Sequence, residues 1–498
     1  MRTVSLPPDS APLPPPDLPV RLSSDALVHT SGQLVAGGAP FRIIRLTPAG
    51  RKLLHRWTAG DRVGEGEAAR QLARRLLDNG LLYPDPQPRA SLANVSAVVP
   101  VRNTAEQLDR CLASLRKADP GLEIIVVDDG SDNAPTIADI ASRYGARLLC
   151  HEQPKNAGTA RNTGLASGTR PLVAFVDADV IIESGSLHRL AAQFDDPAVA
   201  AAAPRVCPLT EAGLIGGYEA RHSSLDMGAA PAPVAPGTWV PYVPSATMVI
   251  RRSALDEVGG FDEALRLGED VDLVWRLVAA GHRVIYDPSA RILHDHRRDP
   301  KAFLARRWQY AYSIGPLARR HPTALYAFKT DLVVAAALSC AVCRRPRLAL
   351  AACLVRVVLL LRALGAPSRL SLWLTREIGQ RMFSGTLRGA AHAVLRTWSP
   401  FLLLHRGTRR LLVVGFLIRL FEHDGPRNPA DVMLNIAEDL VAAFATLASS
   451  ARNLTVRPIL VDFSPTRSLW PNRERLNSIT TDEDLTPPTS RGLDTREP

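Results

Sequence analysis

The feature that most constrains the fold is a regular alternation of short apolar runs and helical segments that begins at residue 95. Four of the apolar runs end in polar residues, and they span 95–100, 123–129, 146–150 and 172–177. The helical stretches between them lie around 104–118, 135–144 and 158–167. Strands that alternate with helices in this way predict an α/β domain with a doubly wound, mostly parallel sheet. Such sheets bind ligands at the carboxyl ends of their strands, which is where the polar residues lie.

A small module precedes this region, and we expect it to be α+β and winged-helix-like. Residues 1–16 are rich in proline and are predicted to be disordered. From 17 to 90, short apolar segments alternate with glycine turns, which indicates strands and hairpins. Thr47 and Pro48 are typical of a helix start, and a second helix is predicted over 67–79. No catalytic cluster occurs in the module, which favours a binding role.

We take the α/β region as 91–310, and the chain that follows it is predicted to be helical. Between 311 and 450 lie apolar runs of 12, 14 and 8 residues. Each is shorter than the ~18 apolar residues that mark a membrane-spanning helix. We interpret them as buried or interfacial helices of a membrane-associated region, with at least one true span as the alternative. Residues 451–498 are polar and rich in proline, and we expect them to form a mostly disordered tail.

Composition restricts the class of protein and its partners. The 498 residues include 60 Lys and Arg against 49 Asp and Glu, a net charge of +11, and 46% are hydrophobic, which excludes a wholly disordered or fibrous chain. The positive charge predicts an anionic partner, and because no nucleic-acid-binding motif is present, nucleic acid is not expected. Cys340 and Cys343 have CxxC spacing without further ligands nearby, so we expect no zinc site. The first residues lack an apolar signal segment, which predicts a cytosolic catalytic part.

Paired carboxylates follow two of the predicted strands. Asp128 and Asp129 precede a Gly-Ser turn, where an acid can accept hydrogen bonds from a nucleobase or ribose. An ordinary turn with an N-capping aspartate is the alternative. Asp177 and Asp179 close the most apolar strand, and two carboxylates there can share a divalent cation that bridges a diphosphate. Oxygen ligands favour Mg²⁺ or Mn²⁺ over zinc, and a surface turn is the simpler alternative.

Two helix starts and a histidine pair complete the set of candidates. The loop 155–164 combines glycines, Arg161 and a helix N-terminus, which suits a sugar or diphosphate, although helix capping explains its Asn and Gly equally. Asp270 opens another helix and is a candidate general base for an acceptor hydroxyl, with helix capping as the alternative. Either His294 or His296 could complete a metal shell or contact the diphosphate.

In this order the motifs resemble those of the family 2 glycosyltransferases of GT-A fold. The resemblance covers 95–300 and rests on DDGS, NxGxARNxG, DAD and GGFDE…GEDVDLVWRL, followed by a histidine. It implies an inverting transfer from a UDP-sugar, with Asp270 as base and with Mn²⁺ or Mg²⁺ held by Asp177, Asp179 and His294. The substrate-binding residues that it implies are Asp129, at the base and ribose, and Pro100, Asn156, Gly158, Arg161, Asp177, Glu269 and Trp275.

The whole chain resembles the glycosyltransferases of the mycofactocin system, in which a small PqqD-like, peptide-binding module precedes the transferase. The resemblance rests on RLTPAG and LARRLLDNGLL in the module, and on YVPSATMVIRRSAL and ARRWQYAYSIGPLARRHP beyond it. It implies that glucose passes from UDP-glucose to a mycofactocin precursor, a peptide-derived redox cofactor, in a β-1,4-linked chain. We expect the enzyme in the cytoplasm or on the cytoplasmic side of the cell membrane, peripheral or shallowly inserted.

A membrane-linked family 2 transferase with a lipid or polysaccharide acceptor is the alternative. Chain-building synthases of the family carry QxxRW, whereas this chain has Arg307-Trp308-Gln309, which disfavours the synthase interpretation. A binding protein on a degenerate transferase scaffold is a third interpretation. The intact carboxylates of the motifs argue against it.

Overall fold

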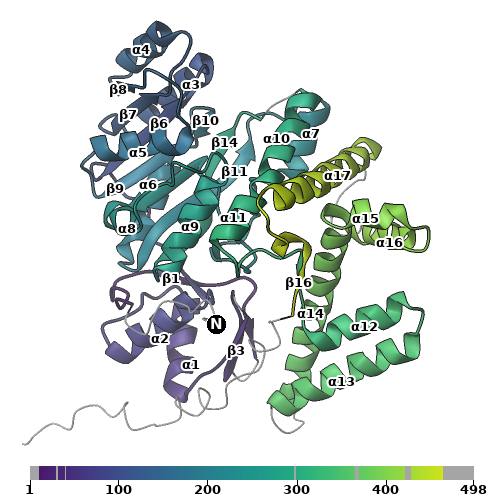
Figure 1. Ribbon diagram of the computed structural model, residues 1–498. Helices are drawn as coiled ribbons and strands as arrows, with labels where there is room; N and C mark the ends of the chain where they lie inside the picture. The colour runs from purple at the N-terminus through teal and green to yellow at the C-terminus, as the bar shows by residue number, and fades with distance from the viewer. Residues whose placement is uncertain are drawn as a thin grey trace, which may run out of the picture.

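The computed structural model describes residues 11–29, 32–39, 41–296, 299–364, 369–420 and 428–463. A small module, a central α/β domain and a set of C-terminal helices follow one another along the chain, from purple to yellow in Figure 1. Residues 1–10 and 464–498, which belong to the segments predicted to be disordered, lie outside the described residues.

The N-terminal module packs two helices and two small sheets around one apolar core. β1 pairs antiparallel with β5, and β2, β3 and β4 form an antiparallel sheet in that order. The predicted first helix is confirmed, because Thr47 caps it by accepting a hydrogen bond from Gly50 N at 3.1 Å. Its elements are β1 (Val20–Leu22), β2 (Leu27–Val28), β3 (Leu34–Gly37), β4 (Arg42–Arg45), α1 (Pro48–Thr58), α2 (Glu67–Asp78) and β5 (Leu82–Pro84).

The segment 11–16 is ordered against α2, which corrects our prediction of disorder for these residues. Arg70 Nε donates a hydrogen bond to Pro14 O at 2.9 Å, and Arg74 Nη1 donates one to Pro12 O at 3.2 Å. Proline lacks an N–H but keeps its carbonyl acceptor, so a proline-rich strand can still be held by arginine donors.

A nine-stranded sheet forms the centre of the α/β domain, in the order β10-β14-β11-β13-β9-β6-β7-β8 with β12 beside β14. The β9-β6-β7-β8 part is parallel, which confirms the four predicted strands, whereas β13 and β10 run antiparallel to their neighbours. The elements are β6 (Val95–Val101), α3 (Ala105–Ala118), β7 (Glu123–Asp128), α4 (Ala134–Arg143), β8 (Arg147–Cys150), α5 (Ala157–Ser167), β9 (Leu172–Val176), β10 (Val180–Ile182), α6 (Ser186–Ala192), β11 (Val199–Pro208), α7 (Gly213–His222), β12 (Ala232–Pro233), β13 (Thr247–Arg251), α8 (Arg252–Val258), α9 (Glu269–Ala279), β14 (Arg283–His294) and α10 (Pro300–Tyr312).

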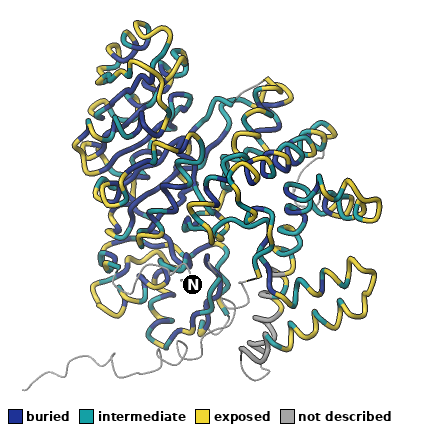
Figure 2. Tube along the Cα trace, viewed as in Figure 1, coloured by how far each residue is buried: buried dark blue, intermediate teal, exposed yellow. Residues whose placement is uncertain are grey.

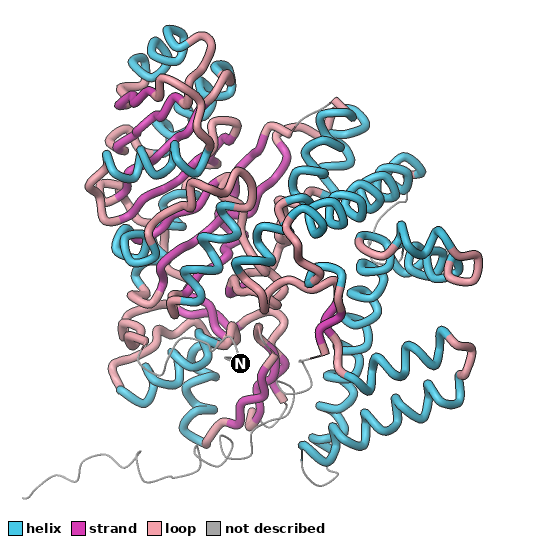
Figure 3. Tube along the Cα trace, in the orientation of Figure 1, coloured by secondary structure: helices cyan, strands magenta, loops and turns pink. Residues whose placement is uncertain are grey.

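Helices cover both faces of this sheet, as Figure 3 shows in cyan against the magenta strands. Alternate residues of a strand point to opposite faces, so one strand contributes to two cores. Val99 and Val126 belong to the core that includes residues of α3, α4 and α6. Val98 and Ile125 belong to the core that includes residues of α5, α8 and α9. Burial on both faces explains why these strands read as continuous apolar runs.

The C-terminal region is helical as predicted, and two helical hairpins, α12–α13 and α15–α16, project from it (Figure 1). Figure 2 shows that these hairpins are mostly exposed, in contrast to the buried strands of the sheet. β15 pairs parallel with β16, so 453–463 folds back onto the helical region, which corrects the expected start of the tail at 451. The elements are α11 (Ile314–Arg320), β15 (Phe328–Lys329), α12 (Leu332–Val342), α13 (Pro346–Leu364), α14 (Arg369–Arg396), α15 (Ser399–Leu404), α16 (Arg409–Leu420), α17 (Pro429–Arg452) and β16 (Val461–Asp462).

Candidate active site

The predicted acidic residues gather at the carboxyl edge of the parallel strands. β7 and β9 flank β6, so Asp129 after β7 and Asp177 after β9 emerge at the same edge of the sheet. Gly268, with a φ of +79°, ends the preceding loop and starts α9, which carries Glu269 and Asp270 at its first turn. Only glycine adopts this backbone conformation without strain.

Arg161 of α5 joins two of these acidic motifs that lie far apart in the sequence. Its Nη2 donates to Asp177 Oδ1 at 2.6 Å, and its Nη1 donates to Glu269 Oε1 at 2.9 Å. The Arg161 side chain is only 3% exposed, and its guanidinium lies 5.3 Å from the ring centroid of Phe261. Burial works to lower the pKa of Arg161, but the two carboxylates together raise it above its ordinary value. Arg161 therefore stays charged and holds the two carboxylates in place.

Asp270 is fixed by backbone amides at the start of α9. Its Oδ2 accepts a hydrogen bond from Ser245 N at 3.1 Å, and its Oδ1 accepts one from Val271 N at 2.8 Å. Burial raises the pKa of the Asp270 carboxyl above its ordinary value, although the Ser245 amide and Arg161 act in the opposite direction. A carboxylate with a raised pKa is a stronger proton acceptor, which suits a general base.

Asp179 and His294 form the part of the site that fits a cation. Asp179 Oδ1 is shielded from solvent without a hydrogen-bond partner and lies 3.5 Å from His294 Nε2. Burial raises the pKa of the Asp179 carboxyl, which His294 opposes and Asp177 reinforces. Carboxylates with one imidazole are a donor set that Mg²⁺ or Mn²⁺ accepts. Among the described residues, no group of three or more His, Cys, Asp or Glu side chains is already arranged around a single metal position.

His296, the other histidine candidate, lies beside Glu219, with its ring centroid 4.6 Å from that of His294. Its Nδ1 lies 3.6 Å from Glu219 Oε2, and burial lowers its pKa to about 3. The antiparallel pairing of β10 with β14 places His294 opposite Val180, one residue beyond Asp179. The strand register therefore brings His294 next to Asp179, and which histidine would hold a metal stays a prediction.

Asp129 lies in the turn that follows β7, and this turn packs against the loop before α5. Its Oδ1 accepts a hydrogen bond from Lys155 N at 2.9 Å and lies 2.7 Å from His151 Nδ1. Asp128, by contrast, is used within the turn, where its Oδ1 accepts from Ser131 N at 3.0 Å. A Cβ on Gly130 would lie 2.9 Å from Pro154 N, so the turn requires glycine there.

The loop residues before α5 have clear structural partners. Asn156 caps the helix by accepting from Thr159 N at 2.9 Å, and its Nδ2 donates to Glu263 O at 2.9 Å. Gly158 follows Asn156 and is buried. A Cβ on Gly164 would meet the Val98 side chain at 2.3 Å, so this glycine lets α5 pack closely on the sheet. Capping and packing therefore account for the amide and glycines that the motif contains.

The two remaining candidates, Pro100 and Trp275, lie within the fold of the α/β domain. Pro100 is half-buried near the end of β6, opposite Val127 of β7. Trp275 is 4% exposed, lies in the core beneath the sheet, and donates from Nε1 to Pro241 O at 2.7 Å. Trp275 thus packs in the core of the domain, and its contact with a substrate stays a prediction.

The comparisons with known proteins agree with this geometry. The model of the glycosyl transferase family 2 matches residues 96–259. An uncharacterized glycosyltransferase of Mycobacterium bovis is 32% identical over 199 residues, which cover 38% of this chain and 82% of that protein. The chain belongs to glycosyltransferase family 2.

More similar relatives exist, although the match spans only part of them. The pre-mycofactocin glycosyltransferases of two Mycobacterium tuberculosis strains are each 44% identical over 311 residues, which cover 62% of this chain and 64% of theirs. Among solved structures, a mannosyltransferase of Pyrobaculum calidifontis in complex with GDP-Man and Mn²⁺ is 19% identical. It has a TM-score of 0.40 and covers 73% of this chain and 90% of its own.

Sequence reasoning did not single out two tyrosines of this family 2 transferase, although both lie in stretches that carry the resemblance to the mycofactocin system, 242–255 and 305–322. Burial raises the pKa of Tyr242, and the Asp270 carboxylate acts in the same direction. Partial burial raises the pKa of Tyr310 to about 12, with Asp270 again contributing, while 38% of the residue remains exposed. Arg306 lies over the Tyr310 ring at 5.8 Å, and its charge acts on Asp179. Helix α10 therefore borders the carboxylate cluster, which only the fold reveals.

Proposed function

We propose that this chain is an inverting glycosyltransferase that moves glucose from UDP-glucose to a mycofactocin precursor and builds a β-1,4-linked oligoglucose chain. The observation that best supports glycosyl transfer is the cluster in which Arg161 binds Asp177 and Glu269 close to Asp270. The acceptor and donor are supported by the similarity to the pre-mycofactocin glycosyltransferases.

In this proposal Asp270 takes the proton of an acceptor hydroxyl as its oxygen attacks the anomeric carbon, and UDP departs from the opposite face. Arg161 donates to Glu269 and Asp177 and orients both carboxyl groups around that position. Asp177, Asp179 and His294 would hold Mg²⁺ or Mn²⁺, which when bound supplies positive charge for the departing diphosphate. Asp129 is proposed to contact the base and ribose from the neighbouring strand end.

The direct test is mass spectrometry of the purified enzyme with the mycofactocin precursor and a panel of UDP-sugars. Addition of hexose units from UDP-glucose alone supports the proposal, and linkage analysis of the product tests the β-1,4 assignment. Transfer only to lipid or polysaccharide acceptors would replace it with the alternative function, which the exposed apolar helices of the C-terminal region favour.

Asp179→Ala is expected to abolish metal-dependent binding of the UDP-sugar while the protein stays folded. The reason is that Asp179 Oδ1 is the shielded carboxylate oxygen without a hydrogen-bond partner in this cluster. Calorimetry of UDP with and without Mn²⁺ measures the effect. Asp132→Ala, an exposed carboxylate outside the cluster, is the control. Unchanged Mn²⁺-dependent affinity in Asp179→Ala would remove this residue from the metal site.

The module 17–90 is proposed to hold the peptide-derived acceptor as an added strand. Its β2-β3-β4 sheet has two edges, and β4 is the longer edge strand. Leu46 N donates to Gln33 O and His29 N donates to Leu34 O, so by antiparallel alternation the amides of Ile43 and Val28 point outward, one at each edge.

Ile43→Pro removes an outward donor from β4 and is expected to raise the acceptor KM with little change in slow UDP-sugar hydrolysis. Val28→Pro at the opposite edge is the matched control. Equal acceptor KM for both variants and the wild type would leave the module with a structural role only. A rise in the Val28 variant alone would move the peptide to β2.

The proposed location is the cytoplasmic side of the cell membrane, with peripheral or shallow attachment. By length and composition, one described helix, α17, could cross a bilayer, but a buried helix of a soluble protein passes the same test. The evidence for membrane attachment is therefore the apolar surface that other C-terminal helices expose.

A further inference from the structure

Two neighbouring helical hairpins present apolar side chains to solvent. We call the exposed surface of α12–α13 and α15–α16 the hairpin face. Leu350 and Leu354 of α13 are 61% and 57% exposed, Val413 of α16 is 59% exposed, and Leu404 at the end of α15 is 83% exposed. Scattered apolar residues are normal on a protein surface, but here the exposed apolar residues gather on two paired hairpins, which indicates an interaction surface.

The two hairpins meet where their arginines gather. Arg410 at the start of α16 donates from Nη2 to Val342 O, the last residue of α12, at 3.2 Å. Arg344 and Arg345 follow at once in the α12–α13 turn and are exposed. The arginines therefore lie beside the apolar surface, at the place where the hairpins touch.

The charge of this part of the chain is unusual in both size and sign. Residues 332–420 contain fourteen arginines, no lysine and a single acidic residue, Glu377, which gives a net charge of +13. The whole chain carries +11, so the remaining residues sum to −2. The positive charge of the protein is thus concentrated in the segment that exposes the apolar helices. A partner that is both apolar and anionic is the one that this combination complements.

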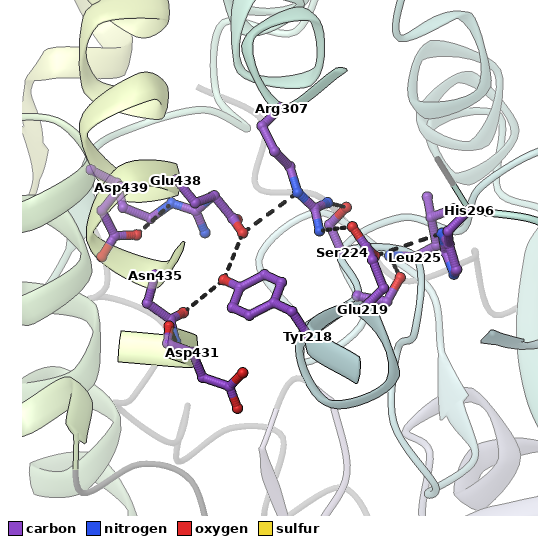
Figure 4. Close-up of polar contacts among 12 residues, drawn as sticks. Tyr218, Glu219, Ser224, Leu225, His296, Arg307, Asp431, Asn435, Glu438 and Asp439 are labelled. Atoms are coloured by element: carbon purple, nitrogen blue, oxygen red, sulfur yellow. Dashed lines mark hydrogen bonds and ion pairs between the residues drawn. The ribbon is translucent and has the colours of Figure 1, made fainter. Parts of the chain in front are cut away.

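Helix α17, in contrast, is bound to the catalytic domain by buried polar contacts. Figure 4 shows Tyr218 and Arg307 pointing at Glu438 of α17. Tyr218 Oη donates to Glu438 Oε2 at 3.0 Å, Arg307 Nε lies 3.5 Å from the same oxygen, and Arg221 pairs with Asp431 at 2.8 Å. Glu438 and Asp431 are buried, so pulling them into a bilayer would break these pairs. α17 is therefore a core helix, although it is the described helix that has the length of a span.

We propose that the hairpin face lies in the headgroup region of an anionic bilayer and holds the enzyme on one leaflet without crossing it. α12 has 11 residues and α16 has 12, so at ~1.5 Å per residue neither reaches across a hydrocarbon core of ~30 Å. α13 has 19 residues, but three of them are arginines, and α17 is the one helix among the described residues that is both long and apolar enough for a span. Arg344, Arg345 and Arg410 sit at the level of the lipid phosphates, with the apolar side chains directed into the acyl boundary. This proposal extends the proposed membrane location by naming the helices and the class of lipid. It does not depend on the identity of the sugar donor or of the acceptor.

Flotation of the full-length protein with vesicles tests the assignment. The wild type is expected to bind vesicles of phosphatidylcholine mixed with phosphatidylglycerol and to bind phosphatidylcholine alone weakly. The double variant Arg344→Glu/Arg345→Glu should weaken binding to the mixed vesicles at least ~10-fold. Lys52→Glu/Lys117→Glu changes the net charge equally on exposed helices α1 and α3, and it should leave binding near that of the wild type.

The apolar contribution has its own matched pair. Leu350→Gln is expected to weaken vesicle binding several-fold, whereas Leu214→Gln, at a residue 53% exposed on α7, should not. Equal binding to both kinds of vesicle, or equal losses in the two double variants, would overturn the proposal. A protein that does not bind vesicles and forms a dimer in solution would also overturn it. The same holds if detergent, but not carbonate, releases the protein from membranes. None of these readouts depends on glycosyl transfer, so their failure is distinguishable from failure of the proposed function.

Discussion

Asp270→Asn is expected to lower turnover at least ~10²-fold while donor binding stays intact. Ser245 N and Val271 N donate to different carboxylate oxygens, so the single amide oxygen of Asn keeps one of these two hydrogen bonds in a side chain of the same size. It cannot take a proton from the acceptor hydroxyl. Steady-state kinetics with acceptor, together with calorimetry of UDP, separates the loss of chemistry from a loss of binding.

Glu269→Gln is the neighbouring control, because Glu269 contacts Arg161 and is not the proposed base. Near-normal turnover in Asp270→Asn together with a large loss in Glu269→Gln would show that the wrong carboxylate is named. The pH profile gives a second check. Because burial raises the pKa of Asp270, wild-type activity should fall as the pH drops through that raised value and the base becomes protonated.

Asp196→Ala is expected to destabilise the protein by about 3–5 kcal/mol, the cost of leaving buried charges without their partner. Asp196 is buried between the module and the catalytic domain, where both its oxygens accept from Arg74 at 2.8 Å. Arg283 Nη1 lies 3.3 Å from the same carboxylate, and its Nη2 donates to Leu77 O of α2. Removing Asp196 takes the bidentate partner away from Arg74 and leaves both buried arginines to share Asp78, which lies 3.1 Å from Arg74 and 3.4 Å from Arg283. Urea unfolding measures the change in the free energy of unfolding.

Asp61→Ala is the matched control, since its ion pair with Arg56 is about half exposed on both sides and should contribute under ~1 kcal/mol. Burial works to raise the pKa of Asp196, but Arg74 and Arg283 hold it below its ordinary value. The stability it contributes is therefore present above the ordinary pKa and is lost as the pH falls through the lower folded value. A loss in Asp196→Ala no larger than that in Asp61→Ala would mean that the module is not held by this charge cluster.

Local pattern was sufficient to predict the parallel part of the sheet. The runs at 95–100, 123–129 and 172–177 are apolar because both faces of β6, β7 and β9 are covered. The run at 146–150 forms the edge strand β8, whose middle residues Leu148 and Leu149 are half-buried, one against each core. The first helix of the module was predictable for a similar reason, since a Thr-Pro start acts through the nearest amides.

The antiparallel strands were harder to read, because nothing local reveals the neighbour with which a strand pairs. β13 lies between β9 and β11, and β10 pairs with the far end of β14. These pairings bring Asp177 and Asp179 to Ala246 and to His294, across long stretches of sequence. The motif residues were therefore identified individually, but the partners of each one were not.

The sequence alone determined the identity of the acidic motifs, the strands that carry them and the family to which they belong, because strand and helix signals are local and the motifs follow one another in a set order. The tertiary structure decided which side chains act together. It placed Arg161 between Asp177 and Glu269, brought His294 next to Asp179, and buried Trp275. It also tied α17 to the catalytic domain and left the hairpins exposed. Contacts between distant segments depend on strand order and helix packing, and these are properties of the folded chain that no single stretch of sequence contains.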